Sequence, residues 1–377
     1  MSQSRSPEYQ WLPTGALCFA AMLEAIQTAS KSVRLETYIY HDDETGLRFR
    51  TALVAAALRG VRVQVLLDAF GSLELSGDFW EPLEAAGGSV RRFNPLSVGR
   101  FGFRNHRKLL VRDEDSAIVG GFNIAREYDG DGVLDGWLDL GLRVVGETAR
   151  ELSRSFDELF HHADYKHKRL MRFRKSPLHE SDVRRSSRVL ISIPGRGGNS
   201  IKRALEREFA RGRDIRIMTA YFLPTWKLRR TLLLAARKGA RVQLLVPGRT
   251  DSTLARLASQ NLFHRLLRAG VEIHEYQPQI LHAKLFLVEE TVFVGSANLD
   301  TRSLSINYEL LVRVQDAGLA RQAHETFAQA LEHSVPVTLA VWKKSRSYWR
   351  KLKERLAYHL LARVDPYVIR HQLKSFR

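Results

Sequence analysis

An internal duplication is the feature that most constrains how this chain can fold. Residues 33–40, VRLETYIY, resemble residues 215–222, IRIMTAYF. The following segments also correspond, because TALVAAALRGVRVQVLL from Thr51 matches TLLLAARKGARVQLLV from Thr231. A chain that repeats a unit of this length is expected to fold as two similar halves.

Each half shows the same order of expected elements: strand, helix, strand, helix, strand and a two-strand hairpin. The first helical stretch of each half ends at a glycine, Gly60 or Gly239, and an alternating strand follows. This order predicts an α/β fold in which each half is a mixed β-sheet flanked by helices. Because the units are too long and divergent for a solenoid, we expect two halves related by a pseudo-twofold axis.

Composition suggests where the halves begin and end. We assign residues 1–165 to the first half and residues 191–342 to the second. Residues 166–190 contain nine Lys or Arg residues and are interpreted as a basic linker. Residues 343–377 form a basic C-terminal tail.

Two matching motifs carry the candidate chemistry. Their residues are His106, Lys108, Asp113, Gly121 and Asn123 in the first half, and His282, Lys284, Glu289, Ser296 and Asn298 in the second. Residues two apart on a strand point to the same face, so each His and its Lys are expected to project together. The small residue near the end of the hairpin would let a ligand approach the backbone, with the Asn amide beside it.

This set of side chains suits displacement at phosphorus. Such a reaction needs a nucleophile, a proton for the leaving alkoxide and positive charge around the phosphoryl oxygens. Two histidines can divide the first two tasks, while two lysines and two asparagines hold the oxygens. Neither half supplies the whole set, so we expect one active site at the interface between the halves.

Chance and zinc binding are the competing explanations of these motifs. One His-x-Lys pair is expected by chance in a chain this basic, but two pairs at matching places in a repeat are not. Neither motif histidine has a second His, Cys or carboxylate at the usual zinc-ligand spacing. We therefore expect no metal and no cofactor.

Four carboxylates accompany the motifs. Asp139 begins DLGLRV and Glu309 begins ELLVRV, which are equivalent segments after the two hairpins. We expect each to hydrogen-bond the histidine of its own half and fix its orientation; the alternative is a solvated acid at a strand end. Asp113 and Glu289 fall near the hairpin turns, where they either join the catalytic set or anchor the loop.

The net charge and the apolar runs narrow the partners. Lys and Arg total 59 against 41 Asp and Glu, and the net charge of +18 favours nucleic acid, acidic lipid headgroups or phosphorylated substrates. A single cysteine, Cys18, excludes an intrachain disulfide and favours a reducing compartment. No apolar run approaches the roughly 20 residues of a spanning helix. We expect a cytoplasmic protein that is peripheral on the inner face of the cell membrane.

The C-terminal tail is a candidate membrane contact. Residues 343–377 contain eleven Lys or Arg and two acidic residues, a net charge of +9. Trp349, Leu352, Leu356 and Leu360 fall on one face of an expected helix. A basic amphipathic helix with Trp is typical of an anchor on anionic lipid. The alternative is a helix that packs its apolar face on the protein body.

The double His-x-Lys-x4-Asp pattern resembles the phospholipase D (HKD) superfamily. NLDTRSLSINYEL from Asn298 and WLDLGLRV from Trp137 resemble bacterial cardiolipin synthases, in the short form without N-terminal transmembrane helices. The resemblance implies phosphatidyl transfer that makes cardiolipin or a related phospholipid from phosphatidylglycerol through a phosphohistidine intermediate. It implies His106 as the nucleophile and His282 as the general acid.

The sequence departs from the family pattern at two positions, and two other functions are possible on this scaffold. Glu289 stands where the family has Asp, with one residue fewer before the glycine, and Gly121 stands where Ser is common. Hydrolysis of a lipid or nucleic acid on the same scaffold is the alternative function, and an inactive membrane-binding protein is the third. The sequence shows no helix-turn-helix or zinc finger, so nucleic acid is not the expected partner.

Overall fold

The protein is described by a computed structural model. Its described residues are 9–95, 102–163, 187–194, 199–344 and 346–365. Most of the predicted basic linker, residues 166–186, therefore lies outside the described residues, as does the end of the tail, residues 366–377.

Within these residues the first half forms one seven-stranded mixed sheet. Its strands, in spatial order, are β1 (Tyr9–Leu12), β7 (Gly141–Val145), β6 (Ser116–Gly120), β5 (Leu109–Arg112), β2 (Ser32–Thr37), β3 (Arg62–Asp68) and β4 (Ser89–Phe93). Strands β2, β3 and β4 are parallel, whereas β5, β6, β7 and β1 continue the sheet in antiparallel fashion. Its helical segments are α1 (Gly15–Gln27), α2 (Glu44–Leu58), η1 (Asp78–Trp80), α3 (Glu81–Ala85), η2 (Arg126–Tyr128) and α4 (Glu147–His161).

The second half repeats this arrangement, with eight described strands in its main sheet. They are β17 (Ser334–Val337), β12 (Glu272–Tyr276), β11 (Arg241–Pro247), β9 (Asp214–Met218), β13 (Leu285–Val288), β14 (Thr291–Gly295), β16 (Glu309–Gln315) and β8 (Ser187–Ser192). A separate parallel pair joins β10 (Phe222–Leu223) to β15 (Leu299–Asp300). The helical segments are α5 (Ser200–Arg211), α6 (Trp226–Arg237), α7 (Thr253–Arg268), α8 (Thr301–Ser305), α9 (Ala317–Glu332), α10 (Leu339–Lys344), α11 (Tyr348–His359) and the π-helical turn η3 (Leu360–Val364).

The predicted α/β duplication is confirmed, and its glycine stops have the expected geometry. Gly60 follows α2 with φ +86° and Gly239 follows α6 with φ +91°, at equivalent places before β3 and β11. This left-handed conformation suits glycine because it lacks a Cβ atom. The same local signal therefore ends the equivalent helix in each half.

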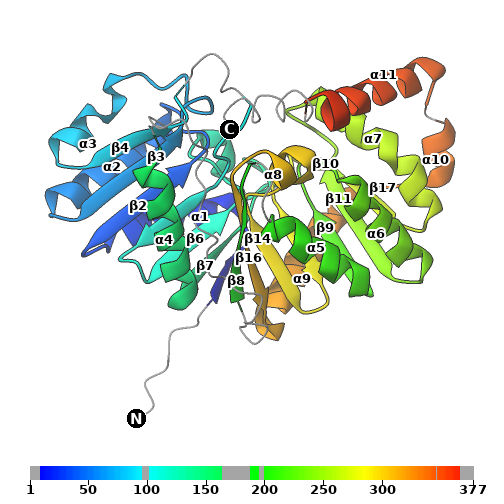
Figure 1. Ribbon diagram of the computed structural model, residues 1–377, viewed down its shortest axis with the longest axis horizontal. Coiled ribbons are helices and arrows are strands. Elements are labelled where there is room, and N and C mark those ends of the chain that lie inside the picture. Colours follow the sequence, from blue (N-terminus) through cyan, green and yellow to red (C-terminus); the bar gives the residue numbers. More distant parts are fainter. Residues whose placement is uncertain (1–8, 96–101, 164–186, 195–198, 345, 366–377) are drawn as a thin grey trace, which may run out of the picture.

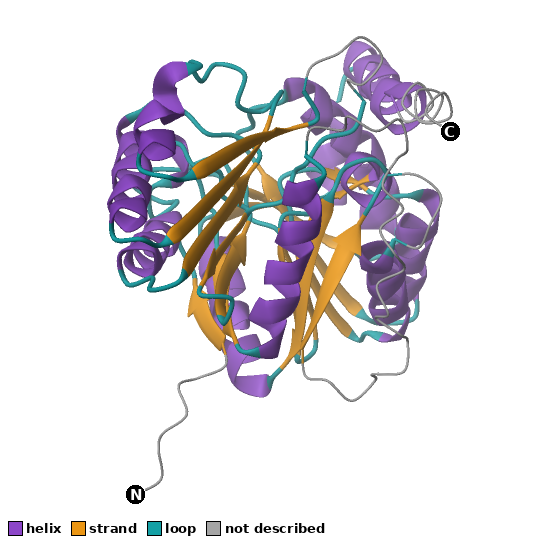
Figure 2. Ribbon diagram, turned by 60° about the vertical axis from the view of Figure 1, so that its left-hand side comes forward, coloured by secondary structure: helices purple, strands orange, loops and turns teal. Residues whose placement is uncertain are grey.

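The core is divided by the two-residue period of the strands. On β5, Leu109 and Val111 face a core that is shared with the second half, while Leu110 faces the helices of the first half. On β13, Leu285 and Leu287 enter the shared core in the same way. The two sheets thus pack against each other, with α2 and α3 on one outer side and α6 and α7 on the other (Figures 1 and 2).

Parts of the linker and of the tail have regular structure among the described residues. The segment Ser187–Ser192, partly assigned to the linker, is strand β8 at the edge of the second sheet. The described part of the tail is helical and packs on α7 through the buried Ala357. Among the described residues, no helix is both long enough and apolar enough to cross a membrane.

Candidate active site

The sheet topology brings the two motifs to the interface between the halves. His106 and Lys108 lie just before β5, and His282 and Lys284 lie just before β13. Because β5 and β13 run antiparallel to β2 and β9, both motifs lie at the carboxyl ends of the parallel strands.

Main-chain contacts fasten each motif to the opposite half. Asn105 forms a parallel bridge with Tyr308, and Leu281 forms one with Leu138. The His106 N–H donates to the Tyr308 carbonyl at 3.0 Å, and the His282 N–H donates to the Leu138 carbonyl at 2.9 Å. The segment before β7 in the first half therefore runs along the second motif, and the segment before β16 in the second half runs along the first motif.

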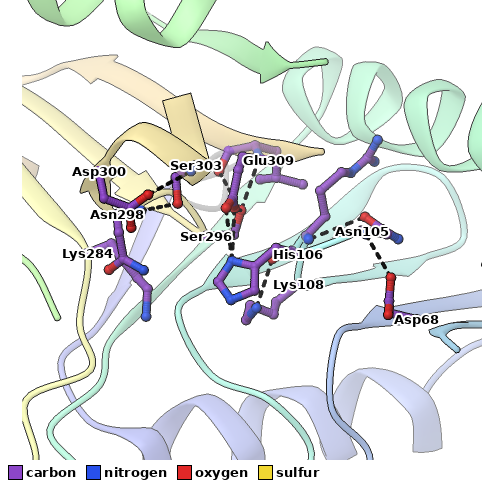
Figure 3. A network of polar contacts seen from close by, with 12 residues as sticks. Asp68, Asn105, His106, Lys108, Lys284, Ser296, Asn298, Asp300, Ser303 and Glu309 are labelled. Atoms are coloured by element: carbon purple, nitrogen blue, oxygen red, sulfur yellow. Dashed lines mark hydrogen bonds and ion pairs between the residues drawn. The ribbon is translucent and has the colours of Figure 1, made fainter. Parts of the chain in front are cut away.

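Each histidine is oriented by a carboxylate from the opposite half. His106 Nδ1 lies 3.0 Å from Glu309 Oε1, and His282 Nδ1 lies 2.8 Å from Asp139 Oδ2 (Figure 3 shows the Glu309 pair). The expectation that each acid serves the histidine of its own half is wrong. The reason is the cross-half bridging, which places Tyr308 beside Asn105 and so carries the next residue, Glu309, to His106.

Burial and nearby cations keep both histidines uncharged. Burial first, and Lys108 and Lys284 next, hold the pKa of His106 well below its usual range. Burial and then Lys284 lower the pKa of His282 to about 4, against the opposing effect of Asp139. A neutral imidazole whose Nδ1–H donates to a carboxylate has an unprotonated Nε2, which is the form a nucleophile needs.

The two lysines bring positive charge to the same place. Lys108 Nζ donates to the His106 carbonyl at 2.8 Å, while Lys284 Nζ donates to the His282 carbonyl and lies 3.0 Å from His282 Nε2. Burial lowers the pKa of Lys108 to about 7 and that of Lys284 to about 8. An anionic phosphodiester between these amines would favour their charged forms.

Ser296 contacts a carboxylate instead of being free to bind phosphate. Its hydroxyl donates to Glu309 Oε2 and accepts the Leu310 N–H at 3.1 Å. Burial raises the pKa of Glu309 to about 8, and Lys108 and then the Ser296 hydroxyl oppose that rise. Ser296 therefore favours the ionised form of Glu309, and because its hydroxyl proton is given to Glu309, its expected role as a phosphate ligand does not fit the geometry.

Gly121, the equivalent of Ser296, leaves room for a carboxylate. A Cβ atom at Gly121 would lie 2.4 Å from Asp139 Oδ1, and that oxygen accepts the Leu140 N–H at 2.8 Å. The expected open approach for a ligand at this glycine is thus filled by Asp139. Glycine, in place of the Ser that is common in the family, avoids a collision between a Cβ atom and the Asp139 carboxylate.

The two asparagines have structural partners at the site. Asn123 Oδ1 accepts the Ile39 N–H at 3.1 Å, and Asn123 Nδ2 donates to the Tyr128 hydroxyl at 2.7 Å. Asn298 Oδ1 accepts the Thr219 hydroxyl at 3.3 Å. Each amide oxygen is therefore held in place, so the second N–H of Asn123 and the N–H groups of Asn298 are the donors left to meet a phosphoryl oxygen.

Asp113 and Glu289 anchor loops at the other ends of β5 and β13. Asp113 Oδ1 accepts the N–H groups of Lys31 and Ser32 at 2.7 and 2.9 Å. Glu289 Oε1 accepts the Asp214 N–H at 3.0 Å. The catalytic option for these two acids is therefore wrong, and the replacement of Asp by Glu preserves the anchoring contact.

Three aromatic residues complete the surroundings of the histidines. The ring centroid of Tyr38 lies 5.1 Å from that of His106, while Tyr128 and Trp137 lie 5.1 and 5.5 Å from His282. Aligning the halves could not identify them, because their repeat equivalents are not aromatic: Ala220, Ser303 and Asn307. Tyr38 lies in the repeated segment 33–40 and Trp137 begins WLDLGLRV, but Tyr128 lies in neither, so no sequence signal identified the three as a group.

Comparisons with known proteins identify the family of the chain. The family model described as "Cardiolipin synthase, PLD-like domain" matches residues 22–159 and 205–331. Cardiolipin synthase 1 of Bacillus cereus is 30% identical over 368 residues, which cover 94% of this chain and 71% of that protein. The cardiolipin synthase of Listeria innocua is 30% identical over 346 residues, covering 90% of this chain and 72% of that protein.

Two solved structures share the fold. Phosphatidylserine synthase from Haemophilus influenzae has a TM-score of 0.77 at 16% identity and covers 98% of this chain and 96% of its own. Polyphosphate kinase from Porphyromonas gingivalis has a TM-score of 0.58 at 17% identity, covering 92% of this chain and 53% of its own. With the family model matched in both halves, the chain belongs to the phospholipase D-like cardiolipin synthase family.

Proposed function

We propose that this protein is a phosphatidyltransferase that makes cardiolipin or a related phospholipid from phosphatidylglycerol. The observation that carries the proposal is the reciprocal pair of histidines, each oriented by a carboxylate of the opposite half. Family membership and the curated relatives support the same reaction class.

In the first step, His106 Nε2 attacks the phosphorus of phosphatidylglycerol. A nitrogen–phosphorus bond forms while the bond from phosphorus to the headgroup glycerol oxygen breaks. His282 donates the proton that the leaving glycerol takes up. Because the pKa of His282 is low in the empty site, the arriving phosphodiester anion must raise it before this step.

In the second step, the hydroxyl of an acceptor glycerol group replaces the histidine. Neutral His282 takes the hydroxyl proton as that oxygen attacks phosphorus, and the nitrogen–phosphorus bond to His106 breaks. Lys108, Lys284 and the amides of Asn123 and Asn298 neutralise the phosphoryl oxygens in both steps. Two successive displacements predict retained configuration at phosphorus.

The reaction is tested by incubating purified protein with labelled phosphatidylglycerol in vesicles and separating the lipids. The proposal predicts labelled cardiolipin and released glycerol, with both lost in His106→Ala. Phosphatidic acid as the only labelled product would instead identify a hydrolase that uses water as the acceptor.

We propose that α11 holds the protein on the inner face of the cell membrane as a peripheral protein. The exposed fractions of Trp349 and Leu356 are 69% and 61%, whereas Glu354 and Ala357 are buried against the body. This orientation supports the anchor over packing of the Trp349 face on the body. Basic residues beside the apolar face add attraction to anionic lipid.

The anchor is tested with vesicles of phosphatidylglycerol. Trp349→Ala is expected to weaken binding, and raised salt is expected to weaken it further, because each basic residue contributes about 1 kcal/mol near an anionic surface. Unchanged binding by Trp349→Ala at every salt concentration would contradict the anchor. A point variant is preferable to deletion of the tail, because Ala357 packs with Leu223 and Ala258.

A further inference from the structure

An apolar groove of about 260 Å³ lies between α7 and α11 (Figure 1 places these two helices side by side). Its lining residues are Leu254, Leu257, Lys353, Leu356, Ala357 and Leu360. Lys353 is the single charged member of this lining, and the other five side chains are aliphatic. The groove therefore presents a hydrophobic surface with one positively charged side chain.

The groove is connected to the catalytic residues through two short strands. Asn298 directly precedes β15, which pairs in parallel with β10, and Phe222 is opposite Leu299. Leu223 of β10 packs with Ala258 of α7 and Ala357 of α11 beneath the groove. The floor of the groove is thus one strand pair away from a residue of the second motif.

The start of α7 also leads from the catalytic site to the groove. The Tyr221 hydroxyl donates to Asp251 Oδ2 at 2.6 Å, and Ser252 caps the helix by accepting the Ala255 N–H. Asp251 is close enough to raise the pKa of Lys284. Leu254, three residues further, already lines the groove.

A substrate for both places must be an amphiphile with an anionic phosphodiester. The catalytic site presents Lys108 and Lys284 to the phosphate, and the groove presents aliphatic side chains with Lys353 to the rest of the molecule. An acyl chain laid along Leu254 and Leu257 leaves water without entering the polar catalytic site. A hydrophilic phosphodiester has no group that would gain from this surface.

We propose that the groove between α7 and α11 binds one acyl chain of the phospholipid substrate while its phosphodiester lies between the two histidines. The inference rests on the proposed phosphatidyl transfer and adds to it a subsite for the lipid chain. It shares Leu356 of α11 with the membrane anchor, but Trp349 does not line the groove and Leu254 is not on α11, so Trp349→Ala and Leu254→Asp test the two sites separately.

The first experiment uses phosphatidylglycerol with a photoreactive diazirine in one acyl chain. After illumination and digestion, mass spectrometry is expected to find the label on peptides that contain residues 254–257 and 356–360. Label confined to other peptides would overturn the inference. This readout needs no turnover, so it tests the groove even if the proposed reaction fails.

The second experiment compares Leu254→Asp with a matched control, Leu234→Asp on α6. The exposed fractions of the two leucines are 40% and 42%, but Leu234 is not in the groove. For Leu254→Asp, the kcat/KM for dioleoyl phosphatidylglycerol divided by that for a dihexanoyl analogue is expected to fall about tenfold. The control is expected to leave this ratio unchanged.

Other results of this comparison would overturn the subsite or call for a second variant. An equal loss for both lipids, or an unchanged ratio in Leu254→Asp, would overturn the acyl-chain subsite. A wild-type dimer that Leu254→Asp converts to monomers, measured by light scattering, would assign the groove to a second copy and also overturn it. If Leu254→Asp does not fold, Leu254→Ala serves in its place and is expected to lower the ratio in the same direction.

Discussion

The two halves present the same His-x-Lys motif on chemically different supports. In the first half, Arg107 Nη2 lies 3.1 Å from Glu36 Oε2, and the Asn105 amide donates to Glu36 Oε1 at 2.7 Å. All three side chains are buried. The main-chain N–H of Asn105 donates to the buried Asp68 at 2.8 Å.

The second half replaces this polar network with apolar packing. The repeat equivalents of Glu36, Asn105 and Arg107 are Met218, Leu281 and Ala283. All three replacements belong to the buried core shared by the two sheets. His282 is instead enclosed by Tyr128 and Trp137 from the first half.

The same motif geometry is therefore stabilised in two ways, by buried polar contacts in the first half and by apolar packing in the second. A buried ion pair positions the residues beside His106. Removing one partner leaves the other charge buried and unpaired, which strongly destabilises the fold. Apolar packing holds the residues beside His282 by shape, and a small change there costs less. The halves should therefore respond differently to equivalent substitutions.

The largest expected effect is on stability. Arg107→Ala leaves Glu36 buried without its cation, so the free energy of unfolding is expected to fall by about 3–5 kcal/mol. Glu36→Met with Arg107→Ala copies the second half and is expected to recover most of that loss. Denaturant unfolding measures both; a double variant less stable than the single would show that the ion pair is not what holds the motif.

The loss of stability in Arg107→Ala should change with pH in a defined direction. Burial raises the pKa of Glu36, and Arg107 opposes the rise, so removing Arg107 raises the pKa further. A carboxyl group whose pKa is raised in the folded state binds its proton more tightly there. Its contribution to stability is present at low pH and is lost as the pH rises through that raised pKa. The deficit of Arg107→Ala is therefore expected to shrink as the pH falls, and a deficit that grows would contradict the assignment.

The next effect is on catalysis. Lys108→Met and Lys284→Met are each expected to lower kcat/KM by about 10²-fold, as for loss of a preorganised charge contact. In the wild type, kcat/KM should fall as the pH rises through about 7 to 8, because both lysines lose their protons there. Lys108→Arg retains its charge, so any activity left in it should lack the Lys108 part of this fall.

The smallest effect compares Ser296 with Gly121. Ser296→Ala removes a hydroxyl that lowers the pKa of Glu309, so the ionisation of Glu309, which gives His106 its carboxylate partner and opposes the fall caused by the lysines, should move to higher pH. A hydrogen bond of about 1 kcal/mol corresponds to a shift of about 0.7 pH unit. Gly121→Ala should act differently, displacing Asp139 through its Cβ and lowering kcat without that shift. Identical profiles for the two variants would remove the distinction.

Much of the fold and the catalytic set could be predicted from the repeat. Apolar period and glycine stops are local signals, so the order of elements followed from the segments around Gly60 and Gly239. The paired His and Lys residues could be identified because both halves retain them. These features depend on residues close together in sequence.

The cross-half contacts could not be predicted in this way. Aligning Asp139 with Glu309 indicates that they are equivalent but not which histidine each one meets, because that depends on how the halves dock. The anchoring role of Asp113 likewise depends on the loop at residues 30–32, far away in sequence. The network of Glu36 and Arg107 is absent from the second half, so the repeat concealed it.

One active site is built from both halves, and we propose His106 as its nucleophile. The most direct test uses His282→Ala, which lacks the general acid, with a phosphatidyl donor that carries a good leaving group. Rapid quenching and tandem mass spectrometry should find the phosphatidyl group on Nε2 of His106. The same group found on His282 in His106→Ala, with none on His106 in His282→Ala, would contradict the account.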